Sequence, residues 1–145
     1  MARTSFDGPL ASGTKQAGIS GGPNVGLAKL VQTGTLNYDA TLVQNLTFYL
    51  PPNAVINDIK ADVLTAFNSA TSATLTAGTA SAGTQYAGSV NAKTAGRATP
   101  TFSAAQLLAM SSVGTNTTVV VTVTSVGQPT AGQVFVTLEY TQTGN

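Results

Sequence analysis

The sequence predicts an all-β protein: an antiparallel sandwich or barrel of short strands, with an extended N-terminal arm and at most one short helix. Only 8% of the 145 residues are charged and 42% are hydrophobic, and threonine supplies most of the remaining polarity. A β-branched polar side chain suits the outward face of a strand better than a helix surface. Short apolar runs recur roughly every ten residues between turn residues, which is typical of an all-β domain.

Residues 1–28 are expected to form an extended arm, and residues 29–145 the packed β domain. The first segment is rich in glycine, and its apolar residues follow neither the strand period nor the helix period. These residues are spaced singly, as anchors that insert into pockets on a partner when a segment orders on binding. The candidate anchors are Phe6, Leu10, Ile19, Val25 and Leu27. A tail without a binding partner is the alternative.

Two weaker strands are predicted first, at Lys29–Thr35 and Gln44–Leu50, and the prolines after Leu50 end the second. The clearest strand follows at Val55–Phe67. Its apolar residues share one parity (Ile59, Ala61, Val63 and Phe67), and its charged residues share the other (Asp58, Lys60 and Asp62). One face of this strand should therefore lie in the core and the other in water.

Weaker strands are also predicted at Ala73–Ala77 and Tyr86–Lys93, each bounded by turn residues. The helical signal is a capping box, with Ser103 at the N-cap and Gln106 at N3, before the apolar residues that end at Met110. We expect one or two helical turns there.

Two strands close the chain. In Thr117–Thr124, valines alternate with threonines, but Val120 stands at a position of the threonine face. We therefore expect this outward, threonine-bearing face to be partly covered. The last strand places Val134, Val136, Leu138 and Tyr140 on one face. Its regular alternation predicts a long central strand.

The residue types disfavour catalysis, and we expect no enzyme activity, metal or cofactor. The chain has no histidine and no cysteine, which removes Ser-His-Asp, Cys-His and zinc sites together. The Cα atoms of Asp58 and Asp62 would lie about 13 Å apart along one strand, which exceeds the roughly 5 to 9.5 Å between the two carboxyl groups of glycosidases. We interpret them, with Lys60 between, as a solvated strand face.

The charge and hydropathy patterns also limit the partners. The net charge is +1, and the basic residues are spread singly from Arg3 to Arg97, so direct nucleic-acid binding is not expected. No apolar run approaches 18 residues, which argues against a membrane span, and the N-terminus lacks the apolar core of a secretory signal. We expect synthesis in a cytoplasm. The low-charge surface favours packing against like copies or a larger partner.

Four stretches resemble small head-decoration or other structural proteins of tailed bacteriophages. They are GGPNVGLAKL at 21–30, TFYLPPNAVINDIKADVLTAFNSATSATLTAGT at 47–79, QYAGSVNAKTAGRATPTFSAAQLLAM at 85–110 and TVVVTVTSVGQPTAGQVFVTLEY at 118–140. The central block is the most specific, and together the stretches cover most of the chain. They carry no catalytic signature.

The resemblance implies a β-sandwich or jelly-roll-like domain on the capsid exterior of a virion, often a homotrimer, whose arm grips the major capsid protein. The arm residues above would then contact the capsid subunit, and Arg3 and Lys15 would pair with its acidic groups. A tail, neck or fibre component is the first alternative. A receptor- or glycan-binding module is the second, although tryptophan is absent and the strand patterns place Phe48, Phe67, Tyr86 and Tyr140 in the core.

Overall fold

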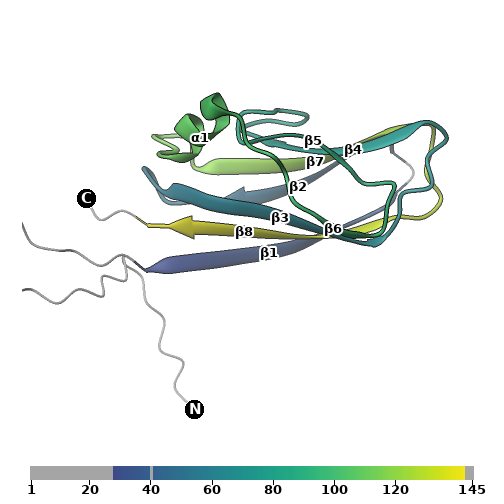
Figure 1. The fold of residues 1–145 in the computed structure, drawn as a ribbon, viewed down its shortest axis with the longest axis horizontal. Helices are drawn as coiled ribbons and strands as arrows, with labels where there is room; N and C mark the ends of the chain where they lie inside the picture. Colours follow the sequence, from purple (N-terminus) through teal and green to yellow (C-terminus); the bar gives the residue numbers. More distant parts are fainter. Residues whose placement is uncertain (1–27, 40, 143–145) are drawn as a thin grey trace, which may run out of the picture.

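A computed structural model describes residues 28–39 and 41–142 as a β-sandwich with one short helix (Figure 1). The elements in chain order are β1 (Lys29–Asn37), β2 (Val43–Tyr49), β3 (Val55–Thr65), β4 (Ser72–Gly78), β5 (Ala87–Asn91), β6 (Gly96–Ala98), α1 (Ala104–Met110), β7 (Thr118–Val126) and β8 (Gln133–Thr141). The predicted all-β class is confirmed. Every predicted strand is present with shifted ends, and sequence analysis missed only the three-residue β6.

The strand order identifies the sandwich as a jelly roll. One sheet has the order β1-β8-β3-β6 and the other β2-β7-β4-β5, and all pairs are antiparallel. The first strand thus pairs with the last, the second with the seventh, the third with the sixth and the fourth with the fifth. This nested pairing describes one long hairpin wrapped around a core, the double-sheet topology of a jelly roll.

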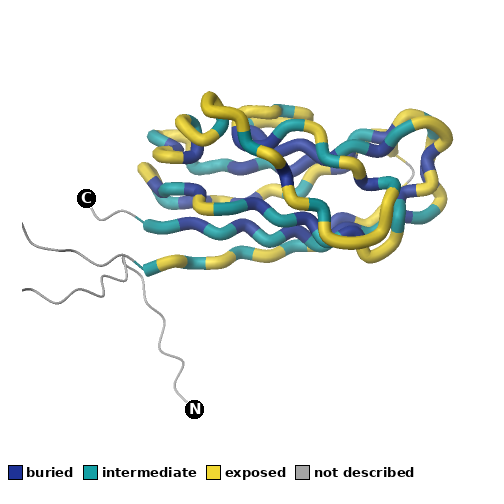
Figure 2. Tube along the Cα trace, in the orientation of Figure 1, coloured by how far each residue is buried: buried dark blue, intermediate teal, exposed yellow. Residues whose placement is uncertain are grey.

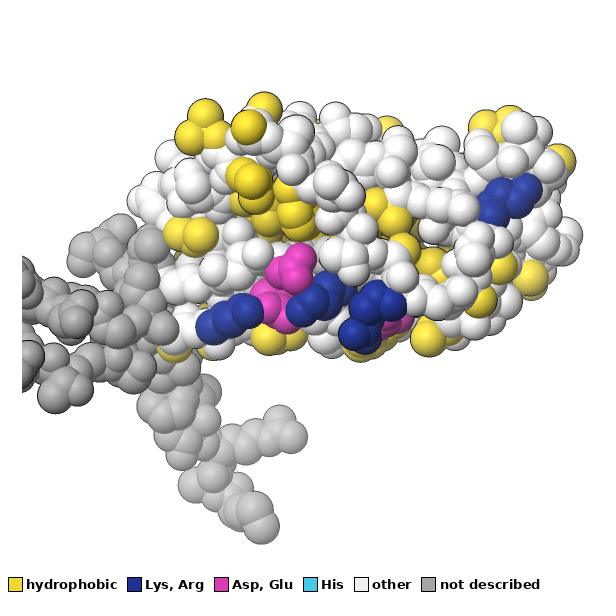
Figure 3. Space-filling view, viewed as in Figure 1, with side chains coloured by type: hydrophobic (Ala, Val, Ile, Leu, Met, Phe, Trp, Pro, Cys, Tyr) yellow, Lys and Arg dark blue, Asp and Glu magenta, His cyan; other side chains and the backbone are white. Residues whose placement is uncertain are grey.

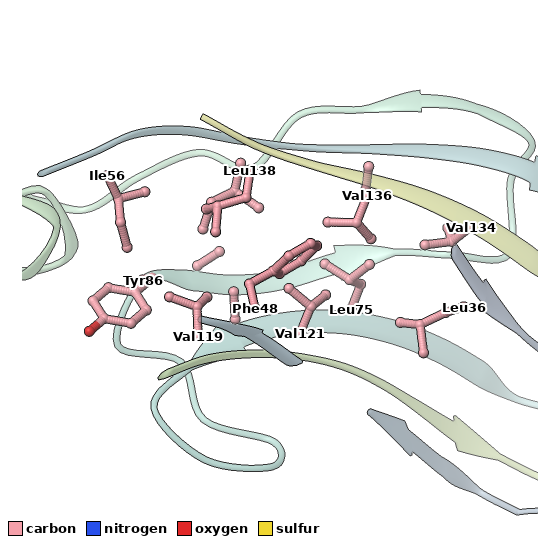
Figure 4. Close-up of a cluster of buried hydrophobic side chains, with 14 of the residues drawn as sticks. Leu36, Phe48, Ile56, Leu75, Tyr86, Val119, Val121, Val134, Val136 and Leu138 are labelled. Atoms are coloured by element: carbon pink, nitrogen blue, oxygen red, sulfur yellow. The ribbon is translucent and has the colours of Figure 1, made fainter. Parts of the chain in front are cut away.

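The core fills the space between the two sheets, where the buried residues of each strand face one another (Figure 2). In Figure 4, Val136 and Leu138 of β8 point towards Phe48 of β2 and Val121 of β7. The predicted core aromatics are confirmed, since Phe48, Phe67, Tyr86 and Tyr140 are all buried. β8 alternates buried and half-buried residues along its whole length and lies between β1 and β3, which confirms the predicted long central strand.

A register shift in β3 extends the buried face beyond the predicted alternation. Ile59, Ala61 and Val63 are buried on one parity, as expected, yet Ile56 is also buried on the other parity. The pairing of β3 with β8 shifts by one residue between Ile56 and Asp58. An extra residue in one strand reverses which parity faces the core. Both isoleucines can therefore pack inward.

The helix α1 begins as the capping box predicts. The Ser103 side chain accepts a hydrogen bond from the Gln106 N–H, and the Gln106 side chain accepts one from the Ser103 N–H. The Gln106 amide also donates to the Thr84 carbonyl oxygen (3.0 Å), which ties the helix to the connection between β4 and β5. Met110 is buried, whereas Leu107 and Leu108 are exposed.

Candidate partner-binding surfaces

The partner-binding residues predicted from the sequence lie outside the described residues. They are Arg3, Phe6, Leu10, Lys15, Ile19, Val25 and Leu27. The first described residue is 28, and β1 begins at Lys29 at the end of the sandwich where β8 finishes and α1 lies (Figure 1). Any contact made by residues 1–27 stays a prediction, and so does the boundary at residue 28. The described residues themselves present three surfaces.

The first surface is the outward face of the β1-β8-β3-β6 sheet, where six charged side chains pair with one another. Glu139 of β8 accepts from Lys29 of β1 and from Lys60 of β3, the latter at 2.6 Å. Lys60 also lies 3.4 Å from Asp58. Figure 3 shows these charges as a band along the sheet.

Asp62 and Arg97 form a separate pair on the same face. The Arg97 guanidinium donates to both carboxylate oxygens of Asp62, at 2.7 and 3.1 Å. The predicted solvated face is thus only partly exposed, because cross-strand neighbours cover it: the side chains of Asp58 and Asp62 are 27% and 25% exposed. The three acids and three bases cancel, so this face carries no net charge.

These contacts shift the pKa values of the groups involved. Hydrogen bonds from Lys29 and then Lys60 lower the pKa of Glu139 from 4.5 to about 2. The hydrogen bond to Glu139 raises the pKa of Lys60, and the hydrogen bond from Arg97 lowers the pKa of Asp62. Each shift favours the charged form, so the ion pairs persist at neutral pH.

Acid should weaken this face through Glu139. A carboxyl whose pKa is lower in the folded state contributes stability above its unfolded pKa and loses it as the pH falls towards the folded pKa. The melting temperature should therefore fall between pH 4.5 and about 2, and Glu139→Gln should flatten that fall. Thermal melts followed by circular dichroism across this range test the prediction. Parallel curves for the two proteins would contradict it.

The second surface is the outward face of the β2-β7-β4-β5 sheet, which the connection between β4 and β5 partly covers. The Ala82 N–H donates to the Thr122 hydroxyl (2.9 Å), and that hydroxyl donates to the Asn45 side-chain oxygen (2.7 Å). The Ser81 hydroxyl also donates to Asn45 (2.9 Å). Thr122 is fully buried as a result. The expected partial cover of this strand face is confirmed.

The third surface is the side of the sandwich formed by β1, β2 and the connection between them. It carries five of the nine exposed large hydrophobic side chains of the described residues: Val31, Tyr38, Leu42, Val43 and Tyr49. β1 is an edge of one sheet and β2 an edge of the other. Gln32 of β1 donates to the Tyr49 carbonyl oxygen (2.8 Å), so the two edges lie side by side. Sequence analysis missed this surface.

The described residues do not assemble a recognisable reactive centre. Asp58 and Asp62 pair with different cations, Lys60 and Arg97. Within residues 28–39 and 41–142, no three potential metal-ligating side chains come together. The exposed Tyr38 follows β1 and the exposed Tyr49 is the last residue of β2. These strand ends lie at opposite ends of the sandwich (Figure 1), so the two rings do not form one platform for a sugar. None of the described helices is long and apolar enough to cross a membrane.

Comparison with known proteins finds a structural likeness to a phage capsid chain. No protein-family model matches the chain, and no curated protein matches it. Among solved structures, a chain of the cyanophage Pam1 capsid asymmetric unit aligns with a TM-score of 0.58 and 21% sequence identity. The alignment covers 91% of this chain and 98% of that one, so the two are of about the same length. At this identity, the likeness shows a shared fold.

Proposed function

We propose that this protein is a structural component of a tailed-phage virion that binds the outside of the capsid as a decoration protein. The observation that carries the proposal is the match of nearly the whole chain to a chain of similar size from a phage capsid asymmetric unit. In this role the protein adds binding free energy across the boundaries between major capsid subunits. Expansion of the shell would then require loss of these contacts, and many copies would act together.

The two outward sheet faces could be covered by a capsid subunit at little electrostatic cost. Burying an unpaired charge is costly, and interface cores are depleted in charge. Here the charges on the β1-β8-β3-β6 face are already paired with one another. The outward residues of the opposite face are mainly threonine, valine and asparagine. A partner could cover either face without leaving an uncompensated charge.

The proposal gives residues 1–28 the role of an arm that holds the major capsid protein. Phe6, Leu10, Ile19, Val25 and Leu27 would insert into pockets of the capsid subunit, and Arg3 and Lys15 would pair with its acidic groups. The jelly-roll domain would stand on the exterior as a homotrimer. Three arms per trimer raise the effective concentration of each arm once one is bound.

Removing residues 1–20 should abolish most binding to capsids that lack this protein. The truncated and full-length proteins are each mixed with such capsids and sedimented, and the pellets are quantified. The truncation leaves every described strand intact, so circular dichroism should be unchanged. Undiminished binding by the truncated protein would refute the role of the arm.

Copy number tests the position in the virion. We expect purified particles to contain this protein in numbers comparable with the major capsid protein, as measured by quantitative mass spectrometry. About a dozen copies or fewer would instead indicate a tail, neck or fibre component. Absence from purified virions would refute a virion role altogether.

A further inference from the structure

The β1/β2 side of the sandwich is an open pair of sheet edges. In an antiparallel ladder, residues alternate between those whose N–H and C=O point to the partner strand and those whose groups point away. The Tyr38 N–H donates to the carbonyl oxygen of Gly132, the residue before β8, so the N–H and C=O groups of the even-numbered residues of β1 point to β8. The backbone groups of Val31, Thr33 and Thr35 therefore point to the free edge.

The same argument applies to β2. The Leu50 N–H donates to the Thr117 carbonyl oxygen, and the Ser125 N–H donates to the Leu42 carbonyl oxygen, so even-numbered residues face β7. The groups of Asn45 and Thr47 point to the free edge. Within the described part of the chain, these edge amides of β1 and β2 have no backbone partner.

Neither edge carries the usual protection against strand pairing. Edge strands are commonly guarded by short length, bulges, proline or charge. β1 has nine residues and β2 has seven, both pair with their neighbours without a register shift, and neither contains proline or any charge beyond Lys29. The opposite side differs, because β5 and β6 have five and three residues and β6 carries Arg97. Among the strands that the structure describes, those of the β1/β2 side are therefore the ones suited to accept a further strand.

We propose that this side binds a second copy of the chain, with β1 of one copy pairing antiparallel with β2 of the next. Setting Thr33 opposite Thr47 places Val31 opposite Tyr49 and Thr35 opposite Asn45. The Tyr49 carbonyl oxygen, which accepts from Gln32 of its own copy, would accept from Val31 through its second lone pair. Val31 is 56% exposed and Tyr49 is 71% exposed. Aromatic with β-branched pairs and threonine pairs are favourable across strands. No charged residue enters this register.

This pairing uses both edges of every copy, which a closed ring of copies satisfies completely. Pairing β1 with another β1 would leave both β2 edges open, whereas β1 with β2 leaves none. A head-to-tail contact gives a closed ring where its rotation closes and an open filament where it does not. The inference rests on the self-association in the proposed function and supplies its interface, and the expected ring is the trimer of that proposal.

Sedimentation velocity on the full-length protein tests the interface without capsids. We expect a trimer for the wild-type chain. The double substitution Thr33→Lys with Thr47→Lys sets like charges opposite each other and should weaken association by about a hundredfold. Thr101→Lys, in the exposed connection between β6 and α1, is the matched control and should remain trimeric. A monomeric wild-type protein, or a trimer in the double variant, would overturn the proposal.

Disulfide trapping gives a second readout that is independent of the lysine variants. The chain has no cysteine, and directly opposed residues in a hydrogen-bonded pair lie about 5.5 Å apart, within disulfide range. Thr33→Cys with Thr47→Cys should give covalent trimers on oxidation. The two side chains lie on opposite outward faces of one copy, so they cannot join within a chain. Covalent dimers from Thr33→Cys alone, or no crosslink in the double variant, would overturn the register.

Capsid binding separates this inference from the proposed function. A wild-type protein that is monomeric yet sediments with capsids would refute the interface and leave decoration standing. A trimer that does not bind capsids would refute decoration and leave the interface standing.

Discussion

Phe67→Ala should lower the free energy of unfolding by about 3 to 5 kcal/mol, the range for removing a buried aromatic side chain. Phe67 is 1% exposed and follows β3. Its N–H donates to the Ala92 carbonyl oxygen (3.0 Å), and the next residue, Asn68, accepts from the N–H groups of Thr130 and Ala131. The ring therefore packs where the connections at one end of the sandwich meet, and its loss would leave a cavity there.

Urea unfolding at one fixed protein concentration measures this effect, since self-association would make stability depend on concentration. Leu108→Ala is the control, because Leu108 is 75% exposed on α1. It should change the free energy of unfolding by less than about 0.5 kcal/mol. An equally small effect of Phe67→Ala would mean that the ring does not occupy the core.

Gly132→Ala should destabilise the protein by about 1 to 3 kcal/mol, the cost of adding a methyl group to a packed core. A Cβ at this position would lie 2.5 Å from the Phe67 ring, and φ is +156°. The ring is held on its other sides by the core, so the clash cannot be relieved by a simple side-chain rotation.

The two substitutions should be strongly coupled. In the Phe67→Ala background the obstructing ring is gone, so Gly132→Ala should cost much less than in the wild-type protein. Gly88→Ala is the matched control, because its added Cβ meets only the Gln106 amide at an ordinary 3.5 Å. Additive effects at Phe67 and Gly132 would contradict the proposed contact.

Much of the fold follows from local sequence patterns. The parity of Ile59, Ala61 and Val63 and the alternation in β8 correctly predicted which residues are buried, because a strand turns successive side chains to opposite faces. The Ser103 and Gln106 capping box correctly predicted α1. β6 was not predicted because a strand of three residues is too short to show a period. The burial of Ile56 was not predicted because a register shift reverses the alternation there.

The candidate surfaces were less predictable. Glu139 lies 79 residues from Lys60 in the chain, and Arg97 lies 35 residues from Asp62. Their spacing gives no signal of these ion pairs, which arise because β3 lies between β8 and β6. The arm residues predicted from the sequence lie outside the described residues, so they remain a proposal.

The sequence by itself determined the all-β class, the strands, the capped helix and the absence of histidine and cysteine chemistry, since each of these depends on residue type or short-range period. Only the tertiary structure decided the jelly-roll order, the neutral ion-paired face and the open edges of β1 and β2. Those features depend on which strands become neighbours, and strand pairing joins residues far apart in the chain whose association no local pattern records.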